Sequence, residues 1–158
     1  MRSNSASSVP PRAARILVGI ALLLSVAACS GPLALFPGGA LEGAVTPAPT
    51  DWGFTEDVST IQLETNPAEP YSVNIWVAAL GPALYVHAGA NRATWIANME
   101  ADPNVRLQVE DAVYELRASR VESQQEFDEF SRVYEEKYGN APRNPNVDEA
   151  YLFRLVAR

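Results

Sequence analysis

The stretch YSVNIWVAALGPALYVHA, residues 71–88, decides the fold class of this chain. Residues 71–79 alternate two sets of side chains, which is the period-two pattern of a strand buried on one face. Residues 83–88 repeat that alternation. The turn Gly81-Pro82 lies between the two segments, and a connection this short favours an antiparallel hairpin over a crossover.

Further β-rich segments lie on both sides of this hairpin and are separated by short turns. Only two segments with helical periodicity interrupt them. This arrangement predicts a mainly β domain of the α+β class, an antiparallel barrel or sheet of about six or seven strands with helices packed outside it. The remaining strands are expected at residues 39–46, 58–65, 105–110, 112–121 and 149–156.

The two expected helices differ in how clearly the sequence marks their ends. Residues 92–101 follow Asn91, whose side chain makes a good N-cap. Residues 124–138 begin with the capping-box spacing Ser123-Gln124-Gln125-Glu126, and Gly139 is well placed at their C-terminal end. The second helix therefore has defined signals at both ends.

Residues 95–105, WIANMEADPNV, carry a family resemblance. They resemble the W-x-x-N-L-x-A-N-P-x-V segment of the deazaflavin (F420)-dependent nitroreductases, a branch of the FMN-binding split β-barrel superfamily that also holds the pyridoxamine 5′-phosphate oxidases. The order of elements over residues 58–158 is similar as well. The resemblance implies an antiparallel split β-barrel of about six strands with two or more packed helices. It also implies FMN or F420 as cofactor, a homodimer, and hydride transfer to a small organic acceptor.

The resemblance also implies where a cofactor would bind. Pocket walls are expected on the strand at residues 71–79 and on the loop at residues 87–95. The tryptophans would wall the flat ring, and the strand asparagine and the histidine would bond its edge. The loop asparagine and arginine would hold the phosphate, because backbone donors at a helix start and an arginine fork both suit anions. The candidate cofactor-binding residues are Asn74, Trp76, His87, Asn91, Arg92 and Trp95.

Several features leave a second hypothesis open. Family members usually carry basic residues in the turn before the first hairpin strand, whereas residues 66–70 here hold Glu69 and no cation. The oxidase branch places a lysine where Trp95 stands, and Trp95 also fits a core position. Trp76 either fills the second side of the sheet or stacks on a ligand. The alternative function is a cofactor-free binding or structural lipoprotein that keeps the barrel without catalysis.

The N-terminal segment predicts export. Residues 16–28, ILVGIALLLSVAA, would rise about 20 Å as a helix, short of the roughly 30 Å hydrocarbon core, which favours a cleaved signal peptide. Residues 26–29, Val-Ala-Ala-Cys, resemble a bacterial lipobox, so we expect cleavage before Cys29 and acylation of its thiol with chains such as palmitate. A plain signal peptide cut after Ala28 is the alternative.

The lipobox resemblance implies that the chain is divided into three parts and that it is located in the cell envelope. Residues 1–28 would be the lipoprotein signal peptide, residues 29–37 a tether from Cys29, and residues 38–158 the split-barrel domain. The acyl chains would anchor the domain to the membrane on the extracytoplasmic side. This side is the periplasm and outer membrane, or the outer face of the plasma membrane.

Charge and composition exclude several other classes. The net charge is 12 − 19 = −7, and without residues 1–28, which hold three arginines and no acid, it is 9 − 19 = −10. A chain so acidic, with Lys137 as its only lysine, is not expected to bind nucleic acid. The single cysteine and single histidine exclude internal disulfides and a His/Cys zinc site, and no metal site is expected. No nucleophile motif is present, so the catalytic residues stay unknown.

Overall fold

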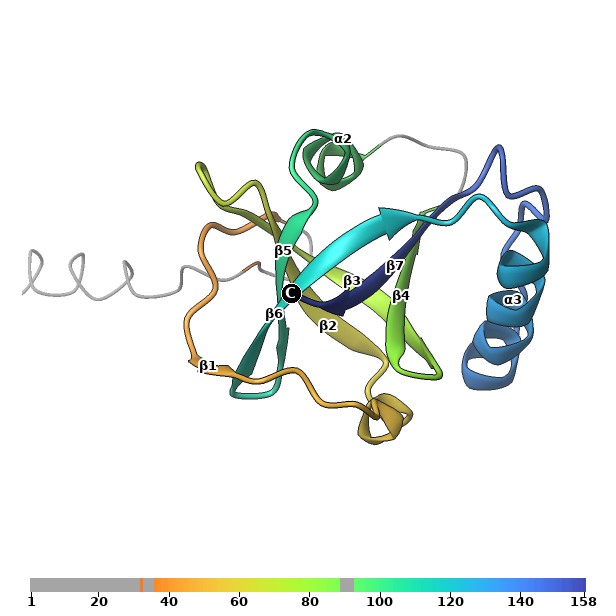
Figure 1. Ribbon diagram of the computed structural model, residues 1–158, viewed down its shortest axis with the longest axis horizontal. Coiled ribbons are helices and arrows are strands. Elements are labelled where there is room, and N and C mark those ends of the chain that lie inside the picture. The colour runs from red at the N-terminus through yellow and green to blue at the C-terminus, as the bar shows by residue number, and fades with distance from the viewer. Residues whose placement is uncertain (1–31, 33–35, 89–92) are drawn as a thin grey trace, which may run out of the picture.

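The computed structural model describes residues 32, 36–88 and 93–158, which form one barrel flanked by helices (Figure 1). No helix among these residues is long and apolar enough to cross a membrane. The elements in chain order are β1 (Ala44–Thr46), η2 (Gly53–Thr55), β2 (Thr60–Thr65), β3 (Tyr71–Leu80), β4 (Ala83–Ala88), α2 (Thr94–Ala101), β5 (Asn104–Val109), β6 (Ala112–Arg120), α3 (Gln124–Tyr138) and β7 (Tyr151–Ala157).

Six antiparallel strands close the barrel in the order β6-β5-β2-β3-β4-β7, with β7 pairing back onto β6. Closure leaves these strands without a free sheet edge. The predicted α+β split barrel of about six strands with two packed helices is confirmed.

The strand expected at residues 39–46 is shorter than predicted and differs in direction. Only Ala44–Thr46 form β1, and they pair with β6 in parallel rather than antiparallel. Gly43, just before β1, lies so close to β6 that a Cβ atom there would meet Val113 Cγ2 at 2.8 Å. The chain therefore approaches β6 at a residue that has no side chain to clash.

The two halves of the hairpin strand β3 pair with different neighbouring strands. Residues 71–76 pair with β2, and residues 77–80 pair with β4. Beside the first half, Gly38 makes two backbone hydrogen bonds of 2.9 Å with Ser72. The segment around Gly38 therefore lies against β3.

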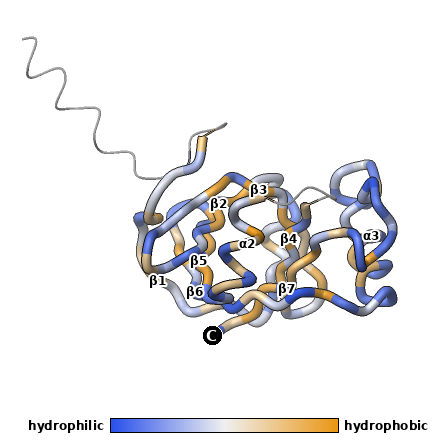
Figure 2. Tube along the Cα trace, turned by 90° about the horizontal axis from the view of Figure 1, so that it is seen from above, coloured by the Kyte–Doolittle hydropathy of each residue, from blue (hydrophilic) through white to orange (hydrophobic). Residues whose placement is uncertain are grey.

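Alternation along β4 divides the apolar residues between two clusters. Leu84 and Val86 point into the barrel, where they join the aliphatic core. Tyr85 lies on the opposite face of β4, which also carries the polar residue His87. The helix α3 covers Tyr85 on this face. In Figure 2, α3 lies at one end of the domain beside β4 and β7.

The ends of the helices confirm one prediction and overturn another. The side chain of Ser123 accepts a hydrogen bond from the Glu126 amide, and Gly139 takes the left-handed conformation at φ 76°, so both predicted ends of α3 are confirmed. For α2, the N-cap is Ala93 rather than Asn91, so the predicted cap is wrong. Burial of Trp95, whose ring reaches the barrel core, places the helix start despite the lack of a capping side chain.

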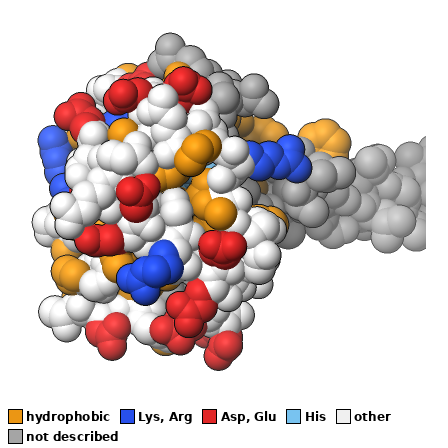
Figure 3. Space-filling model, turned by 90° about the vertical axis from the view of Figure 1, so that its right-hand side faces the viewer, with side chains coloured by type: hydrophobic (Ala, Val, Ile, Leu, Met, Phe, Trp, Pro, Cys, Tyr) orange, Lys and Arg blue, Asp and Glu red, His pale blue; other side chains and the backbone are white. Residues whose placement is uncertain are grey.

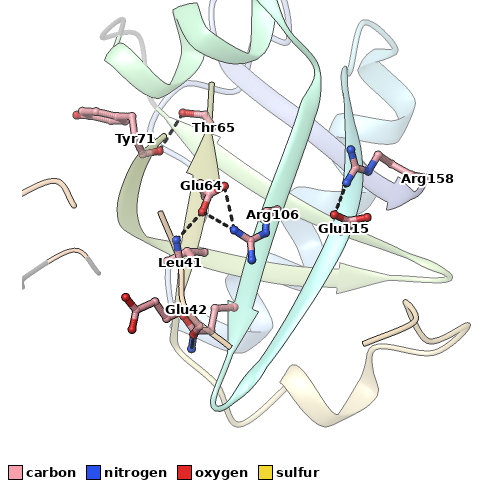
Figure 4. A network of polar contacts seen from close by, with 9 residues as sticks. Leu41, Glu42, Glu64, Thr65, Tyr71, Arg106, Glu115 and Arg158 are labelled. Carbon is pink, nitrogen blue, oxygen red and sulfur yellow. Dashed lines mark hydrogen bonds and ion pairs between the residues drawn. The ribbon is translucent and has the colours of Figure 1, made fainter. Parts of the chain in front are cut away.

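A buried ion pair fixes the segment before β1 to the barrel wall. Glu64 on β2 is only 3% exposed, and Arg106 Nη1 on β5 lies 3.1 Å from its Oε2 atom. The backbone amide of Leu41 donates to the same oxygen at 2.5 Å. Figure 4 shows Glu64 between Leu41 and Arg106. Because both partners are hydrogen-bonded, this carboxylate is satisfied despite its burial.

Candidate functional site

A cavity of about 510 Å³ lies where α3 crosses the outer face of the β3–β4 hairpin. One lining residue comes from each of β3, β4 and α3, and the loop after α3 supplies the rest. The lining thus combines aromatic rings, an amide, an imidazole and a guanidinium. The lining residues are Trp76, His87, Tyr134, Asn140, Ala141, Pro142 and Arg143.

Trp76 reaches the cavity because it is on the outer face of β3, opposite to the inward-facing Val77. Its side chain remains 48% exposed. The Tyr138 ring stacks on it with centroids 4.7 Å apart and an interplanar angle of 10°. This stacking fixes the plane of the indole, so that Trp76 presents a flat apolar wall.

His87 packs under α3 among three aromatic rings. Ring centroids of Phe127, Phe130 and Tyr134 lie 5.9–6.4 Å from its own. Burial lowers the pKa of His87 from 6.5 to about 4, because it disfavours the charged form. The imidazole is therefore neutral at neutral pH.

The Nε2 atom of His87 is buried and has no hydrogen-bond partner among the residues that the structure describes. A buried polar atom without a partner costs about 1–3 kcal/mol. A ligand group that bonded to this nitrogen would remove that cost. His87 is thus the lining residue with an unused polar function.

The C-terminal end of α3 is held by a lysine that has no donor left for a ligand. Lys137 Nζ donates to the carbonyls of Thr55 at 2.7 Å, Val58 at 2.8 Å and Val77 at 2.8 Å. These three bonds use all the protons of an ammonium group. Burial lowers the pKa of Lys137, while nearby acids oppose that shift. The role of Lys137 is therefore to attach the C-terminal end of α3 to the barrel.

Tyr138 completes this attachment. Its hydroxyl accepts from the Val77 amide at 3.1 Å and lies 2.8 Å from the Val77 carbonyl and 2.9 Å from that of Ser59. Burial raises the pKa of both Tyr138 and Tyr134. The two tyrosines therefore remain protonated at neutral pH.

A second cavity, about 430 Å³, lies beside Lys137 and is lined by Glu56, Asp57 and Glu136 among others. Figure 3 shows acidic side chains spread over the face that carries α3, with hydrophobic ones between them. Among the described residues that line the larger cavity, Arg143 is the one cation. An anionic group would therefore find favourable charge at Arg143 and unfavourable charge around it.

The structure brings together two of the six predicted cofactor-binding residues, Trp76 and His87. Asn74 also faces outward on β3, but its Nδ2 atom lies 3.4 Å from the Pro32 carbonyl. Trp95 is 7% exposed and packs in the barrel core, 6.1 Å from the ring of Phe153. The predictions for Asn91, Arg92 and Cys29 fall outside the described residues.

No role was assigned from the sequence to the other lining residues. Tyr134 lies on the buried face of α3 with Phe127 and Phe130. Asn140, Pro142 and Arg143 belong to an Asn/Pro-rich loop without a motif. The sequence signal that could have indicated these lining residues was the series of aromatic residues on one face of α3, followed by Arg143 in the next loop.

One family model matches the chain, that of the F420H(2)-dependent quinone reductases, over residues 83–150. The matched segment begins with β4, ends before β7 and contains His87, Tyr134 and Arg143. No curated protein sequence matches the chain.

Several solved structures share the fold. A conserved hypothetical protein from Mycobacterium tuberculosis is 23% identical with a TM-score of 0.55, covering 66% of this chain and 76% of its own. A structure described as a domain-swapped dimer is 16% identical with a TM-score of 0.52, covering 62% and 80%. A structure described as an F420-H2 dependent reductase is 13% identical with a TM-score of 0.50, covering 73% and 99%. These similarities show that the domain has the split β-barrel fold.

Proposed function

We propose that this chain is a lipid-anchored, extracytoplasmic reductase that binds F420, or a flavin, in the cavity under α3 and reduces a small organic acceptor such as a quinone. The observation that carries the proposal is the unpartnered Nε2 atom of His87, a residue that lines a cavity of about 510 Å³ together with the aromatic rings of Trp76 and Tyr134. The match to the quinone reductase family supports it, because the matched residues include much of this cavity.

The cavity fits the ring of a deazaflavin or flavin better than it fits the charged tail. A flat apolar slot with a few polar groups is typical of a ring pocket. Trp76 and Tyr134 would wall the ring, and His87 would bond its edge. Arg143 would pair with a phosphate or carboxylate of the tail.

A reduced deazaflavin supplies a hydride when bound, so the chain need not contribute a strong acid or base. Its aromatic walls would orient the ring and exclude water. His87 is neutral at neutral pH and can donate or accept one hydrogen bond at Nε2. The buried imidazole would therefore hold a ring-edge oxygen or nitrogen in place without adding charge.

Acylation at Cys29 is the second part of the proposal. The apolar run at residues 16–28 followed by Cys29 supports it. Two or more acyl chains are needed for stable anchoring, and a lipobox cysteine receives them. In the native host, the wild-type chain is expected in the membrane fraction and the Cys29→Ala variant outside it. A variant that stays with the membrane would contradict acyl anchoring.

The alternative is a cofactor-free binding lipoprotein, and one observation favours it. All three protons of the Lys137 ammonium group are donated to carbonyl groups. Among the described residues that line the cavity, Arg143 is the one that carries a positive charge. A polyanionic tail would gain little from such a site. A small apolar ligand would fit the same cavity without needing more cations.

The discriminating experiment is a titration of the purified protein with F420 and with FMN, followed by absorbance and by thermal melting. Bound ligand at about 100 times its Kd is expected to stabilise the fold by about 2.7 kcal/mol. His87→Leu and Arg143→Ala are expected to weaken binding. Arg117→Ala, an exposed arginine of β6 outside the cavity lining, is the matched control. Absence of a melting shift with either cofactor would overturn the cofactor proposal.

We include a homodimer in the proposal, supported by the related structure described as a domain-swapped dimer. Val45 and Phe54 are large apolar side chains exposed on the domain, and such side chains are common in interfaces. Light scattering on the purified protein is expected to give the mass of two chains. A monomeric mass at all accessible concentrations would contradict the dimer.

A further inference from the structure

Residues a few positions after Cys29 are tied to β3 by backbone and side-chain hydrogen bonds. The bridge between Gly38 and Ser72 is antiparallel, with two hydrogen bonds of 2.9 Å. The same register continued by two residues places Phe36 opposite Asn74. The side chain of Asn74 also lies 3.4 Å from the carbonyl oxygen of the buried Pro32.

This attachment limits how far Cys29 can lie from β3. Cys29 stands three positions before Pro32 in the sequence. A fully extended chain spans at most about 3.3–3.6 Å per residue, so three residues of chain reach no further than roughly 10 Å from Pro32. An acyl group on Cys29 would thus hold the outer face of β3 next to the bilayer.

Two large apolar side chains are exposed at this place. Phe36 is 68% exposed and Trp76 is 48% exposed. Residues directly opposite in an antiparallel pair point to the same face, and so do residues two apart in a strand. Phe36, Asn74 and Trp76 therefore share the outer face of β3, which we call the β3 outer surface.

We infer that the β3 outer surface contacts the headgroup region of the lipid bilayer, an inference that rests on the proposed acylation of Cys29. Tryptophan is enriched at membrane interfaces because its ring is apolar and its N–H is polar. The remaining two tryptophans are buried, Trp52 at 1% and Trp95 at 7% exposure, so Trp76 is the one available for this contact.

The net charge of the domain would not by itself bring the β3 outer surface to the bilayer. The chain after residue 28 carries a net charge of −10, which opposes binding to anionic lipid. Two aromatic side chains alone give only weak binding. The acyl group would therefore supply the affinity, and the aromatic side chains would set the orientation.

The contact has a consequence for the cavity. Trp76 belongs both to the β3 outer surface and to the cavity lining. The rim of the cavity would therefore lie at the bilayer surface, close to molecules dissolved among the headgroups. Arg143, an exposed residue of the same lining, could then approach a lipid phosphate.

The test couples a maleimide-bearing lipid to Cys29, the only thiol, on residues 29–158, which contain every element of the fold. The coupled protein is placed on phosphatidylcholine vesicles whose acyl chains carry bromine, a quencher of tryptophan fluorescence. We expect Trp76 emission to shift to shorter wavelength and to be quenched. Trp76→Phe should lose this quenching, because the other tryptophans are buried.

The matched control moves the exposed tryptophan to another side of the barrel. In Figure 2, β3 lies along one side of the domain and β7, with the C-terminus, along the opposite side. Val156 on β7 is exposed, so Val156→Trp in the Trp76→Phe background gives a second surface probe. This probe should remain unquenched by the brominated lipid and accessible to acrylamide in water.

Three outcomes would overturn the inference: an unquenched Trp76, equal quenching at both positions, or a Trp76 protected from lipid and acrylamide alike, which would indicate that a second copy covers the surface. The mass of the Cys29 peptide from native membranes tests acylation separately. An unmodified peptide would remove the proposed anchoring, whereas the coupled protein would still report on the surface.

Discussion

The barrel interior and the layer between the barrel and α3 are both buried, yet they are built differently. The interior is mostly aliphatic, with Leu63, Leu107 and Leu116 completely buried. The layer under α3 is aromatic and holds a histidine and three tyrosines whose pKa values burial shifts. It also ends in a cavity of about 510 Å³. The contrast suggests that the interior supplies stability and that the layer under α3 supplies the site.

The largest effect is expected in the interior. Leu84 is on the inward face of β4 and fully buried. Leu84→Ala should lower the free energy of unfolding by about 2–5 kcal/mol, because it removes apolar contacts and leaves a cavity. Urea unfolding measures it. If Leu84→Ala cost less than Trp76→Ala, on the outer face of the same hairpin, the interior would not be the main source of stability.

The next effect is a pH dependence from the layer under α3. The pKa of His87 is about 4 in the folded state and about 6.5 when unfolded. Between these values the unfolded chain binds more protons, so stability falls as pH falls from 6.5 to 4, by roughly 3 kcal/mol in total. Unfolding free energies measured across this range should show the loss.

His87→Phe is the control for that pH dependence, because phenylalanine fills the same space without titrating. The variant should show a flatter stability profile between pH 4 and 6.5. If both proteins lost stability equally over this range, another group would be responsible and the assigned burial of His87 would be wrong.

A smaller effect is expected where α3 is fixed to the sheet. Lys137→Met keeps the length of the side chain but removes the donor for three carbonyl groups. We expect a loss of about 1–3 kcal/mol, because these acceptors lose their partner in a partly buried place. Urea unfolding measures the loss, and hydrogen exchange in α3 should locate it. Unchanged exchange in α3 would contradict the assigned role.

The smallest effect on stability is expected at the rim of the cavity. Arg143 is exposed, so Arg143→Gln should change the free energy of unfolding by less than about 0.5 kcal/mol. The same variant should bind an anionic ligand about tenfold more weakly, which corresponds to 1.4 kcal/mol. Thermal melting with and without ligand separates the two effects. A destabilised variant would mean that Arg143 belongs to the fold rather than to the site.

The sequence predicted most of the elements because their signals are local. The hairpin pattern and the Ser123 and Gly139 ends of α3 depend on residues close together in the chain. The predicted Asn91 cap was wrong because burial of Trp95, a distant contact, sets the start of α2. The parallel pairing of β1 was also missed, because its partner β6 is far away in the sequence.

The site was predicted only in part. Trp76 and His87 were selected because the family resemblance pointed to their strands, and the structure places both at one cavity. Tyr134 and Arg143 were not selected. Their approach to the hairpin depends on how α3 crosses the sheet, and no local pattern encodes that crossing.

Alternation and composition, which are properties of the chain alone, were enough to predict a mainly β antiparallel domain with two helices, the outward position of Trp76 and His87, and the acidic character of the domain. The three-dimensional packing was needed to show that α3 buries the outer face of β4, that this burial leaves His87 neutral and its Nε2 atom without a partner among the described residues, and that Lys137 donates to three carbonyl groups. These properties depend on which surfaces meet in space, and residues far apart in sequence create them together.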